Sequence, residues 1–430
     1  MNNSINPGPP CLLTMPDYSG TLAAVRVFGE RGIGVTVAGS HWLAPARWSR
    51  YVDRVVSCPQ PQDPERFCEW LLDFGERQPG FFLYPTCDDL AWLFASQTEA
   101  LKRNFVLFQP PTRTMVRLLD KRALQTICAE VGVHTVPTWF PENSGEVERL
   151  AREIEMPVLI KPRTQVMLRS RNKGVIVERG SELARRYAEF SARHRYFPSA
   201  AKDFGDLSQP MLQAFCSEAS YATYSVAGFV DRAGQVLAAR ASRKLLQRPR
   251  RVGVGLCFES APVAPEALEA VVRVCRAVGY YGVFEVEFVV RDGIHLLIDF
   301  NPRYYGQMGF EVARGMPLPL FAWLAACDRQ AELERLAVAS QVSASEDENR
   351  VYCFRVPHEF LLALRRAAGT TSRDEYAHWR KWSSNHAGRM LDFSEDSRDR
   401  IPALVHVAAD LWYCARYARG FYAGCVLDKS

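Results

Sequence analysis

The sequence predicts a mixed fold: an α/β part with a parallel sheet comes first, α+β structure follows, and helices close the chain. Three observations predict it. The apolar run 11–14, the helical pattern 21–30 and the β-branched run 33–38 form a β-α-β opening, which is typical of a parallel sheet. Two further runs, 282–290 and 294–300, flank an Asp-Gly turn and are expected to form a strand pair. The C-terminal part alternates Arg with Trp, Tyr and Leu in a helical pattern.

Length and composition indicate a soluble globular protein. The chain has 430 residues, and domains usually span about 100–200 residues, so more than one domain is expected. Hydrophobic residues make up 48% and charged residues 23% of the chain, which is ordinary. The formal net charge of +5 is mild. It does not require nucleic acid as a partner, but it is compatible with anionic ligands such as nucleotides.

Cysteine spacing and the chain ends exclude several classes. None of the twelve cysteines forms a CxxC pair, so neither a zinc site nor a disulfide framework is predicted, and the thiols are expected to be reduced. The N-terminus lacks the basic region and apolar core of a secretory signal. No apolar stretch reaches the ~18 residues of a membrane span. The cytoplasm is the expected location.

Composition shifts divide the chain into four segments. A break with two prolines at 109–112 is expected to end the N-terminal α/β domain. One helix is predicted over 114–130, ending at Gly132. A polar linker at 341–348 precedes the helical end of the chain. The expected segments are 1–112, 113–210, 211–328 and 329–430.

The strongest chemical signal is an acidic cluster on the predicted strand pair. Glu285 and Glu287 lie two residues apart, so strand alternation places both on one face. The next strand ends with Asp299, Asn301 and Arg303. Carboxylate and amide oxygens suit Mg²⁺, and a guanidinium suits phosphate charge. The alternative interpretation is a strand pair with a surface salt bridge.

Two lysines precede this cluster. Lys161 follows the apolar run 157–160 and comes before a proline. Lysine is rarely buried without a partner, and a phosphate would supply one. Lys121 follows Asp120 on the predicted helix. For Lys121 the alternative is a solvent-exposed position.

The ordered motifs resemble the ATP-grasp superfamily, and most closely its carboxylate–amine ligases of the D-aspartate ligase type. The motifs are Asp120-Lys121, Val136-Pro137-Thr138, Leu159-Ile160-Lys161-Pro162, Leu212-Gln213-Ala214-Phe215, Ser242-Arg243-Lys244, Glu285-Val286-Glu287-Phe288 and Asp299-Phe300-Asn301-Pro302-Arg303. The resemblance covers residues 10–328. It implies an α/β domain before a two-lobed ATP-grasp fold, with its first lobe and lid in 113–210 and its second lobe in 211–328.

The resemblance also implies how ATP would bind. Lys121 and Lys161 are expected to contact the phosphates. Gln213 and Phe215 lie where the family has its adenine-binding hinge, and Glu218 is the candidate for the ribose hydroxyls.

Catalytic and metal-binding roles follow from the same resemblance. Arg243 and Lys244 are expected to contact the phosphate or acyl-phosphate, and Arg303 to stabilise the transferring phosphoryl group. The implied ligands of Mg²⁺, or alternatively Mn²⁺, are Glu287, Asp299 and Asn301.

The chain departs from the family pattern at two places. Asp299 stands where the family usually has Glu, which puts the metal geometry in doubt. Many members have a glycine-rich lid after the second lysine, but residues 163–173 contain no glycine. Cationic side chains, among them Arg169, Arg171 and Lys173, are expected to replace backbone amides there. An exposed basic loop is the alternative.

The implied reaction joins a carboxylate to an amine through an acyl-phosphate, with release of ADP and phosphate. Alternatives are a thiol, hydroxyl or bicarbonate acceptor, or a non-catalytic nucleotide-binding subunit. Small-molecule carboxylates and amines are the expected partners. Nucleic acid is not expected, because the basic run 243–251 lacks interleaved aromatic residues.

Two other regions allow more than one interpretation. Asp88 and Asp89 are expected to cap the helix that follows them, although either could instead contact a substrate amine. The aromatic and basic segment 379–422 could lie at a membrane interface or pack against the molecule or a second subunit, and packing is favoured. A homodimer is possible.

Overall fold

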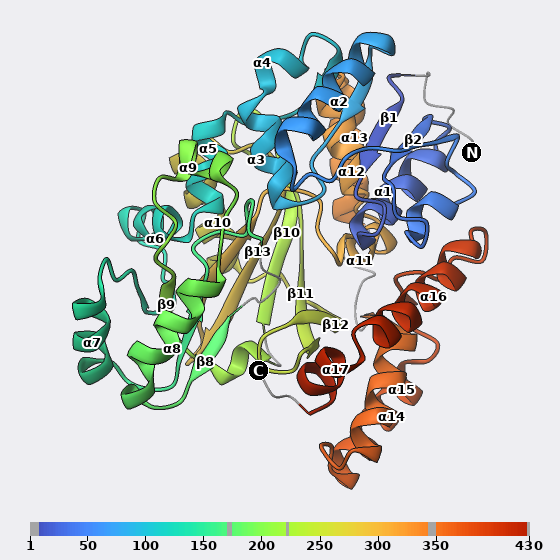
Figure 1. Ribbon diagram of the computed structural model, residues 1–430. Helices are drawn as coiled ribbons and strands as arrows, with labels where there is room; N and C mark the ends of the chain where they lie inside the picture. Colours follow the sequence, from blue (N-terminus) through green and yellow to red (C-terminus); the bar gives the residue numbers. More distant parts are fainter. Residues whose placement is uncertain (1–7, 170–173, 221–222, 343–349, 428–430) are drawn as a thin grey trace.

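The N-terminal part is a five-stranded parallel sheet with the order β3-β2-β1-β4-β5, seen at the top of Figure 1. The computed structural model describes residues 8–169, 174–220, 223–342 and 350–427. The strands are β1 (Cys11–Thr14), β2 (Val35–Ala38), β3 (Arg54–Val56), β4 (Phe81–Leu83) and β5 (Phe105–Leu107). The connecting helices are α1 (Ser19–Gly29), η1 (Pro45–Trp48), α2 (Pro64–Arg77), α3 (Asp88–Ser96) and α4 (Thr98–Leu101). The predicted β-α-β opening is confirmed.

Strand order in this sheet reverses at β1, because β2 and β4 flank it on opposite sides. The segments that follow β1 and β4 therefore diverge at the carboxyl edge of the sheet. Open α/β sheets hold their ligands at such a point. Here the edge faces the rest of the molecule, and it contributes one wall of the site described below.

The helix predicted over 114–130 is in fact two helices, α5 (Thr112–Leu119) and α6 (Lys121–Glu130). Asp120 separates them with an extended backbone (φ −90°, ψ 114°) and accepts a hydrogen bond from the Arg122 N–H as the N-cap of α6. An aspartate competes for backbone donors in this way, and so it favours a helix start over a helix interior. The break places Lys121 in the first turn of α6.

A four-stranded sheet follows, with the order β6-β9-β7-β8. Its strands are β6 (Thr138–Trp139), β7 (Val158–Lys161), β8 (Val175–Val177) and β9 (Met211–Ala214). The helices α7 (Ser144–Glu153) and α8 (Gly180–Arg193) pack on it through Val147, Leu183 and Phe190. Two short helices, η2 (Pro198–Ala200) and α9 (Ala201–Phe204), lead back to β9.

The largest sheet has seven strands with the order β14-β13-β10-β11-β12-β15-β16. Its strands are β10 (Thr223–Val230), β11 (Val236–Arg248), β12 (Val254–Ala261), β13 (Gly282–Arg291), β14 (Ile294–Asn301), β15 (Val351–Cys353) and β16 (Met390–Asp392). The predicted pairing of β13 with β14 is confirmed. The helices around it are η3 (Ser217–Ser220), α10 (Pro265–Val278), α11 (Met308–Ala313), α12 (Leu318–Ala326) and α13 (Gln330–Val342).

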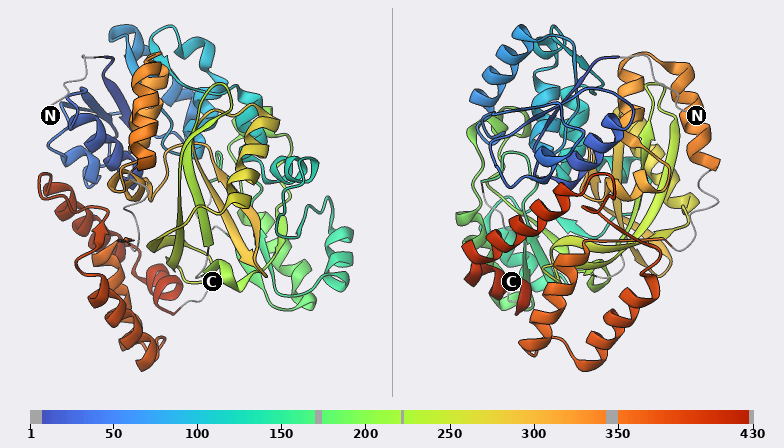
Figure 2. Two further views of the ribbon diagram at one scale, coloured as in Figure 1. Left: turned by 180° about the vertical axis from the view of Figure 1, so that it is seen from behind. Right: turned by 90° about the vertical axis from the view of Figure 1, so that its right-hand side faces the viewer.

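The C-terminal part contains the helices α14 (Arg355–Ala367), α15 (Arg373–His386), α16 (Ile401–Arg416) and α17 (Ala418–Phe421), followed by a π-turn at Tyr422–Val426. In both views of Figure 2 these orange and red helices lie at the lower edge of the molecule, with the N-terminal part above them. The helical character was predicted, but β15 and β16 were not. These two short strands join the C-terminal part to the seven-stranded sheet.

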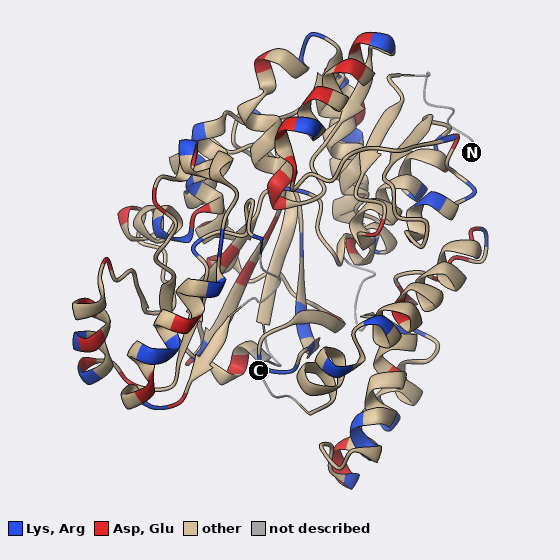
Figure 3. Cartoon of the chain, in the orientation of Figure 1, with Lys and Arg blue, Asp and Glu red and all other residues tan. Residues whose placement is uncertain are grey.

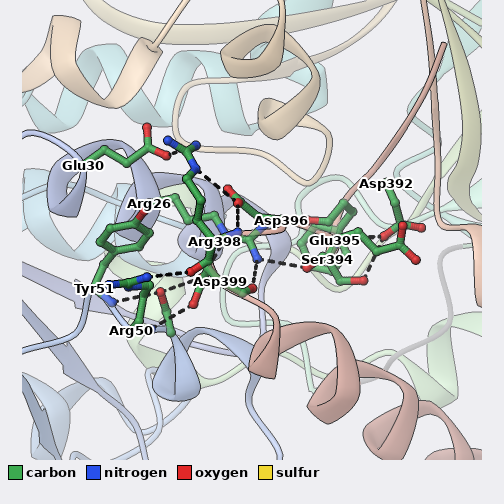
Figure 4. A network of polar contacts seen from close by, with 12 residues as sticks. Arg26, Glu30, Arg50, Tyr51, Asp392, Ser394, Glu395, Asp396, Arg398 and Asp399 are labelled. Atoms are coloured by element: carbon green, nitrogen blue, oxygen red, sulfur yellow. Dashed lines mark hydrogen bonds and ion pairs between the residues drawn. The ribbon is translucent and has the colours of Figure 1, made fainter. Parts of the chain in front are cut away.

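Asp399 joins the C-terminal part to helix α1 and to the segment after η1 in the N-terminal part (Figure 4). Its buried carboxylate accepts hydrogen bonds from Arg26 Nε (2.9 Å), Ser49 Oγ (2.8 Å) and the Arg50 N–H (2.9 Å). A carboxylate with three donors is a strong local anchor. In the described ranges, no helix has both the length and the apolar character needed to cross a membrane.

Candidate active site

A cavity of about 280 Å³ lies between the four-stranded sheet, the seven-stranded sheet and the start of α3. The charged and polar side chains that line it come from segments far apart in sequence. They are Asp88, Lys121, Lys161, Gln165, Gln213, Thr223, Lys244, Gln247, Arg251, Glu285, Glu287, Asp299, Asn301, Arg303, Tyr305 and Gln307. Most of the residues singled out from the sequence therefore share one cavity.

The acidic cluster forms one wall of this cavity. Glu287 on β13 is the register partner of Asp299 on β14, and Glu285 is the partner of Asn301. Cross-strand partners lie on the same face of a sheet, so all four side chains face the cavity. Asn301 Nδ2 donates to Glu285 Oε2 at 2.6 Å, and Gln307 Nε2 donates to Glu285 Oε1 at 2.9 Å. Glu285 thus holds the Asn301 amide by its nitrogen, so that the amide oxygen Oδ1 points away from Glu285.

Lys121 and Asp299 form an ion pair across the cavity, with Nζ and Oδ1 2.5 Å apart. Burial alone would lower the pKa of Lys121, but Asp299 outweighs it and the pKa is raised. Burial alone would raise the pKa of Asp299, but Lys121, Lys161 and Arg303 hold it below its ordinary value. Both groups are therefore charged at neutral pH. For Glu285, burial and the neighbouring Glu287 raise the pKa.

One end of the cavity is apolar. Val136, Leu159, Phe215, Ala219 and Ile298 line it. Gln213 lies next to these side chains, and its Nε2 donates to Thr138 Oγ1 at 3.2 Å. A flat ring can be buried against such a surface while polar groups at its edge select for it.

Arg243 and Lys244 are neighbours on β11 but lie on opposite faces of the sheet. Lys244 is buried and lines the cavity. Arg243 is exposed, and its Nη1 contacts Glu259 Oε1 at 3.1 Å. The alternation of side chains along a strand separates the two. The structure brings Lys244 into the cavity and leaves Arg243 outside it.

Glu218 also lies outside the cavity lining. It occupies the short turn η3, and its Oε2 lies 3.5 Å from Arg291 Nη2 at the end of β13. Of the residues predicted from the sequence, Glu218 and Arg243 are the two that the structure does not gather with the others.

Arg303 is held in place by three acceptors. Its Nε donates to Asp88 Oδ1 at 2.5 Å, its Nη2 to Asn301 Oδ1 at 2.7 Å and its Nη1 to the Tyr304 carbonyl at 3.0 Å. Burial alone would lower the pKa of Arg303, but Asp88 raises it. The guanidinium is consequently a fixed cation at the junction between the N-terminal sheet and β14.

Asp88 does not cap α3 as expected. The N-cap of α3 is Cys87, which makes no side-chain capping bond. Asp88 instead pairs with Arg303, and the buried Asp89 accepts hydrogen bonds from the Met167 N–H (2.6 Å) and Gln62 Nε2 (2.9 Å). Burial raises the pKa of Asp89 to about 6. Both aspartates thus connect the N-terminal sheet to other parts of the chain.

The carboxyl edge of the N-terminal sheet closes the end of the cavity where Arg303 lies. Ser19 Oγ donates to the Gly306 carbonyl at 2.6 Å, and the Tyr304 N–H donates to the Pro85 carbonyl at 3.1 Å. A Cβ at Gly20 would lie 2.5 Å from the Tyr305 carbonyl oxygen, so only glycine allows α1 to approach this closely. Nothing in the sequence indicated that the start of α1 contacts residues 304–306.

The basic run at the end of β11 serves two different parts of the molecule. Arg251 lines the cavity together with Gly253 and Gly255. Arg248 and Arg250 turn to the C-terminal helices, where they pair with Asp410 and Glu375. In the basic loop that follows β7, Arg163 pairs with Asp120. The guanidinium of Arg169 lies over the Phe197 ring, 4.2 Å from its centroid. Arg171 and Lys173 lie outside the described residues.

No protein-family model matches the chain, and no curated protein matches it. Solved structures do resemble it. The biotin carboxylase domain of Hydrogenobacter thermophilus 2-oxoglutarate carboxylase, in complex with MgADP, ADP and bicarbonate, gives a TM-score of 0.60 at 20% identity, over 75% of this chain and 70% of that one. For biotin carboxylase from Campylobacter jejuni the values are 0.56, 18%, 77% and 70%. For an L-amino acid ligase from Bacillus licheniformis they are 0.55, 15%, 75% and 74%.

These structures are ATP-grasp enzymes. The chain has the ATP-grasp fold. At these identities the likeness concerns the fold, so the chemistry has to be argued from the side chains in the cavity.

The oxygen-bearing side chains of the cavity fit a metal ion shared with phosphates. The described part of the chain contains no group of three or more His, Cys, Asp or Glu side chains that could hold a metal ion by itself. The cavity offers two carboxylates in register, Glu287 and Asp299, with the Asn301 amide beside them. Mg²⁺ is usually held by one or two carboxylates, and substrate phosphates supply further oxygens. The residues therefore fit such an ion when a nucleotide is bound with it.

Sequence reasoning missed Tyr305 and Gln307, which line the cavity next to Glu285. Both follow the Asp299–Arg303 motif by only a few residues. They follow the end of β14, and side chains of β14 face the cavity. Their position just after the motif could therefore have indicated that they lie in the site.

Proposed function

We propose that this protein is an ATP-dependent, cytoplasmic ligase that activates a carboxylate as an acyl-phosphate and transfers the acyl group to an amine. One observation carries the proposal: Lys121, Lys161 and Lys244 share a single cavity with Glu287 and Asp299 in an ATP-grasp fold. Phosphoryl transfer depends on positioning and on neutralising charge, and these are the groups it requires.

In this proposal the nucleotide lies along the cavity. The apolar end with Phe215 and Leu159 would hold the adenine ring, with Gln213 at its edge. Lys161 and Lys244 would neutralise the phosphates, because both lie on the cavity wall. Glu218 and Arg243 are left out of the proposed site, since neither lines the cavity.

Magnesium, or manganese, would be held by Glu287, Asp299 and Asn301. When bound, the ion neutralises phosphate charge. Lys121 now pairs with Asp299, so we expect its ammonium to lie close to both the ion and the phosphates.

The proposed reaction has two steps. A carboxylate oxygen of the acid attacks the γ-phosphorus of ATP, the bond to the β,γ-bridging oxygen breaks, and ADP leaves. The amine nitrogen then attacks the acyl carbon, phosphate leaves, and the nitrogen loses a proton. Arg303, fixed by Asp88 and Asn301, would stabilise the negative charge that develops on the transferring group.

Two kinds of acceptor are supported by the similar structures. An amine acceptor is supported by the L-amino acid ligase among the similar structures and by the motifs that resemble carboxylate–amine ligases. The carboxylase complex with bicarbonate supports bicarbonate as the second candidate. Both candidates use the same nucleotide site.

The test is release of ADP by the purified protein with Mg-ATP and pooled amino acids, dipeptides and other small acids, with and without bicarbonate. We expect ADP release that depends on an acid together with an amine, and mass spectrometry of the active pool then identifies the amide. ADP release that requires an acid together with bicarbonate, and no amine, would favour the second candidate. ATP binding without ADP release in any pool would contradict the ligase proposal.

A further inference from the structure

Exposed large apolar side chains gather along the outer side of α16. Leu404 is 72% exposed, Leu411 56% and Ile401 53%. In Figure 1 this helix runs along the outside of the molecule at the right. Monomeric proteins rarely leave such a stretch uncovered, and contiguous exposed apolar surface marks a site of interaction.

The exposed side chains lie on one face of the helix. Their spacing of three and four residues follows the helical repeat. We call this set the α16 apolar face; its members are Ile401, Leu404, Ala408, Leu411, Trp412 and Ala415, all of them exposed. The opposite side of α16 turns inward, where His406 contacts Phe393 and Phe354. The helix is thus anchored on one side and uncovered on the other.

Tryptophans extend this face. Three of the nine tryptophans are exposed, namely Trp42, Trp48 and Trp412. Trp42 and Trp48 belong to the loop and turn η1 that pack beside α16. The His41 ring lies 5.9 Å from that of Trp412, and Trp48 Nε1 donates to the Trp42 carbonyl at 2.7 Å. Tryptophan is enriched where a protein meets the boundary between lipid and water.

Around the α16 apolar face the acidic side chains are paired with arginines inside the molecule, while arginines are exposed at the two ends of the helix. Asp399 is buried against Arg26, and Asp410 is turned toward Arg248. The exposed charges at the two ends of α16 are arginines: Arg400 at its start, and Arg416 and Arg419 at its end. Figure 3 shows most of α16 in tan. The result is an apolar face with a cationic residue at each end.

We propose that the α16 apolar face, with Trp42 and Trp48, binds the interface of a bilayer that contains anionic lipids. The helix lies along the surface with its apolar side chains among the acyl chains, and the arginines contact anionic headgroups. A second copy of the chain fits less well. Because both ends of α16 are cationic, a two-fold pairing of these helices sets arginine beside arginine in either orientation. Lipid phosphates and carboxylates neutralise both ends.

The experiment measures co-flotation of the full chain with phosphatidylcholine vesicles, with and without phosphatidylserine. The wild type is expected to float with the phosphatidylserine vesicles, and its tryptophan emission shifts to the blue. The double variant Leu404→Glu/Leu411→Glu is expected to bind about tenfold or more weakly. The matched control, Val338→Glu/Ile294→Glu, changes exposed apolar residues away from this surface and is expected to bind like the wild type.

Three outcomes would overturn the proposal. The first is no flotation of the wild type with phosphatidylserine vesicles. The second is equal binding by the Leu404→Glu/Leu411→Glu variant, provided its thermal unfolding matches that of the control. The third is a dimer in light scattering that this variant dissociates, since α16 would then be an interface between copies. None of these outcomes depends on the proposed ligase activity.

Discussion

Glu287 is the carboxylate of the cavity on which the proposed metal depends most. Asp299 is already engaged by Lys121, and the Asn301 amide is fixed by Glu285 and Arg303. Glu287 faces the same cavity from the neighbouring strand. A single acid-to-amide change there removes one charge and keeps the shape of the side chain.

Glu287→Gln is expected to lower substrate-dependent ADP release by about 100-fold, because one anionic ligand of the proposed metal is lost. Thermal unfolding should change little, because Glu287 is only half-buried. The measurement compares ADP release and melting temperature with those of the wild type. Undiminished turnover in the variant would remove Glu287 from the metal site.

His358 on α14 gives a second prediction at the scale of one residue. It is buried, and neither ring nitrogen has a hydrogen-bond partner among the described residues. Burial lowers its pKa to about 4. The unfolded chain, with an ordinary histidine pKa, takes up the proton first as the pH falls, so the folded state loses stability between pH 6.5 and 4.

His358→Leu should therefore remove part of the acid sensitivity. From pH 7 to pH 4.5 the wild type is expected to lose about 2 kcal/mol of unfolding free energy that the variant keeps. Urea unfolding at both pH values measures this difference. An identical loss in the two proteins would show that His358 is not the group responsible.

At the scale of elements, the period of two along each strand decides which side chains meet. Lys244 and Glu287 share a face of the seven-stranded sheet, because Thr223 and Ser225 of β10 lie between them in register. Arg243 lies on the other face. Two cations adjacent in sequence are therefore expected to differ sharply in function.

Lys244→Ala is expected to weaken ATP binding about tenfold or more, since a buried cation on the cavity wall proposed to hold the phosphates is lost. Arg243→Ala is the matched control on the same strand. It removes an exposed ion pair with Glu259 and should leave ATP affinity within about twofold. Isothermal titration calorimetry measures both. Equal effects of the two substitutions would contradict the assignment of faces.

The sequence predicted the elements that have a strong local pattern. The run at β1, the Asp-Gly turn between β13 and β14 and the end of α6 just before Gly132 are examples, because their side chains determine the backbone locally. It failed where a single residue opposes its surroundings, as Asp120 does by ending one helix and starting the next. It also failed for β15 and β16, which are three residues long: β15 is held by pairing with β12, and β16 by pairing with β15.

The same contrast applies to the candidate site. Strand alternation was enough to place Glu285 and Glu287 together. The pairing of Asp88 with Arg303 was not predictable, since 215 positions separate them and only the docking of the N-terminal sheet brings them together. Arg243 could have been separated from Lys244 by the alternation that had been applied to the glutamates.

At the scale of the whole molecule, the N-terminal part is joined both to the residues that follow β14 and to the C-terminal helices. Through Asp88, Ser19 and Pro85 it closes one end of the cavity. Through Arg26, Ser49 and the Arg50 N–H, the same N-terminal part also holds the buried Asp399 of the C-terminal part. Loss of that second contact should therefore affect stability more than chemistry.

Asp399→Ala is expected to lower the unfolding free energy by about 3 kcal/mol, because Arg26 would keep a largely buried charge without its carboxylate. Glu395→Ala is the control from the same segment, since it removes a half-exposed pair with Arg355 and should cost less than about 1 kcal/mol. Urea unfolding of both variants provides the comparison. A similar cost for the two would show that Asp399 is not the anchor.

The central claim is that a carboxylate becomes an acyl-phosphate. It is tested most directly by labelling the active acid with ¹⁸O in its carboxyl group and analysing the phosphate released with Mg-ATP and the acceptor. Attack of the carboxylate on the γ-phosphorus transfers one labelled oxygen, so the account predicts phosphate that carries one ¹⁸O per turnover from fully labelled acid. Unlabelled phosphate at the same turnover would show that the carboxylate never bonded to phosphorus, and it would contradict the account.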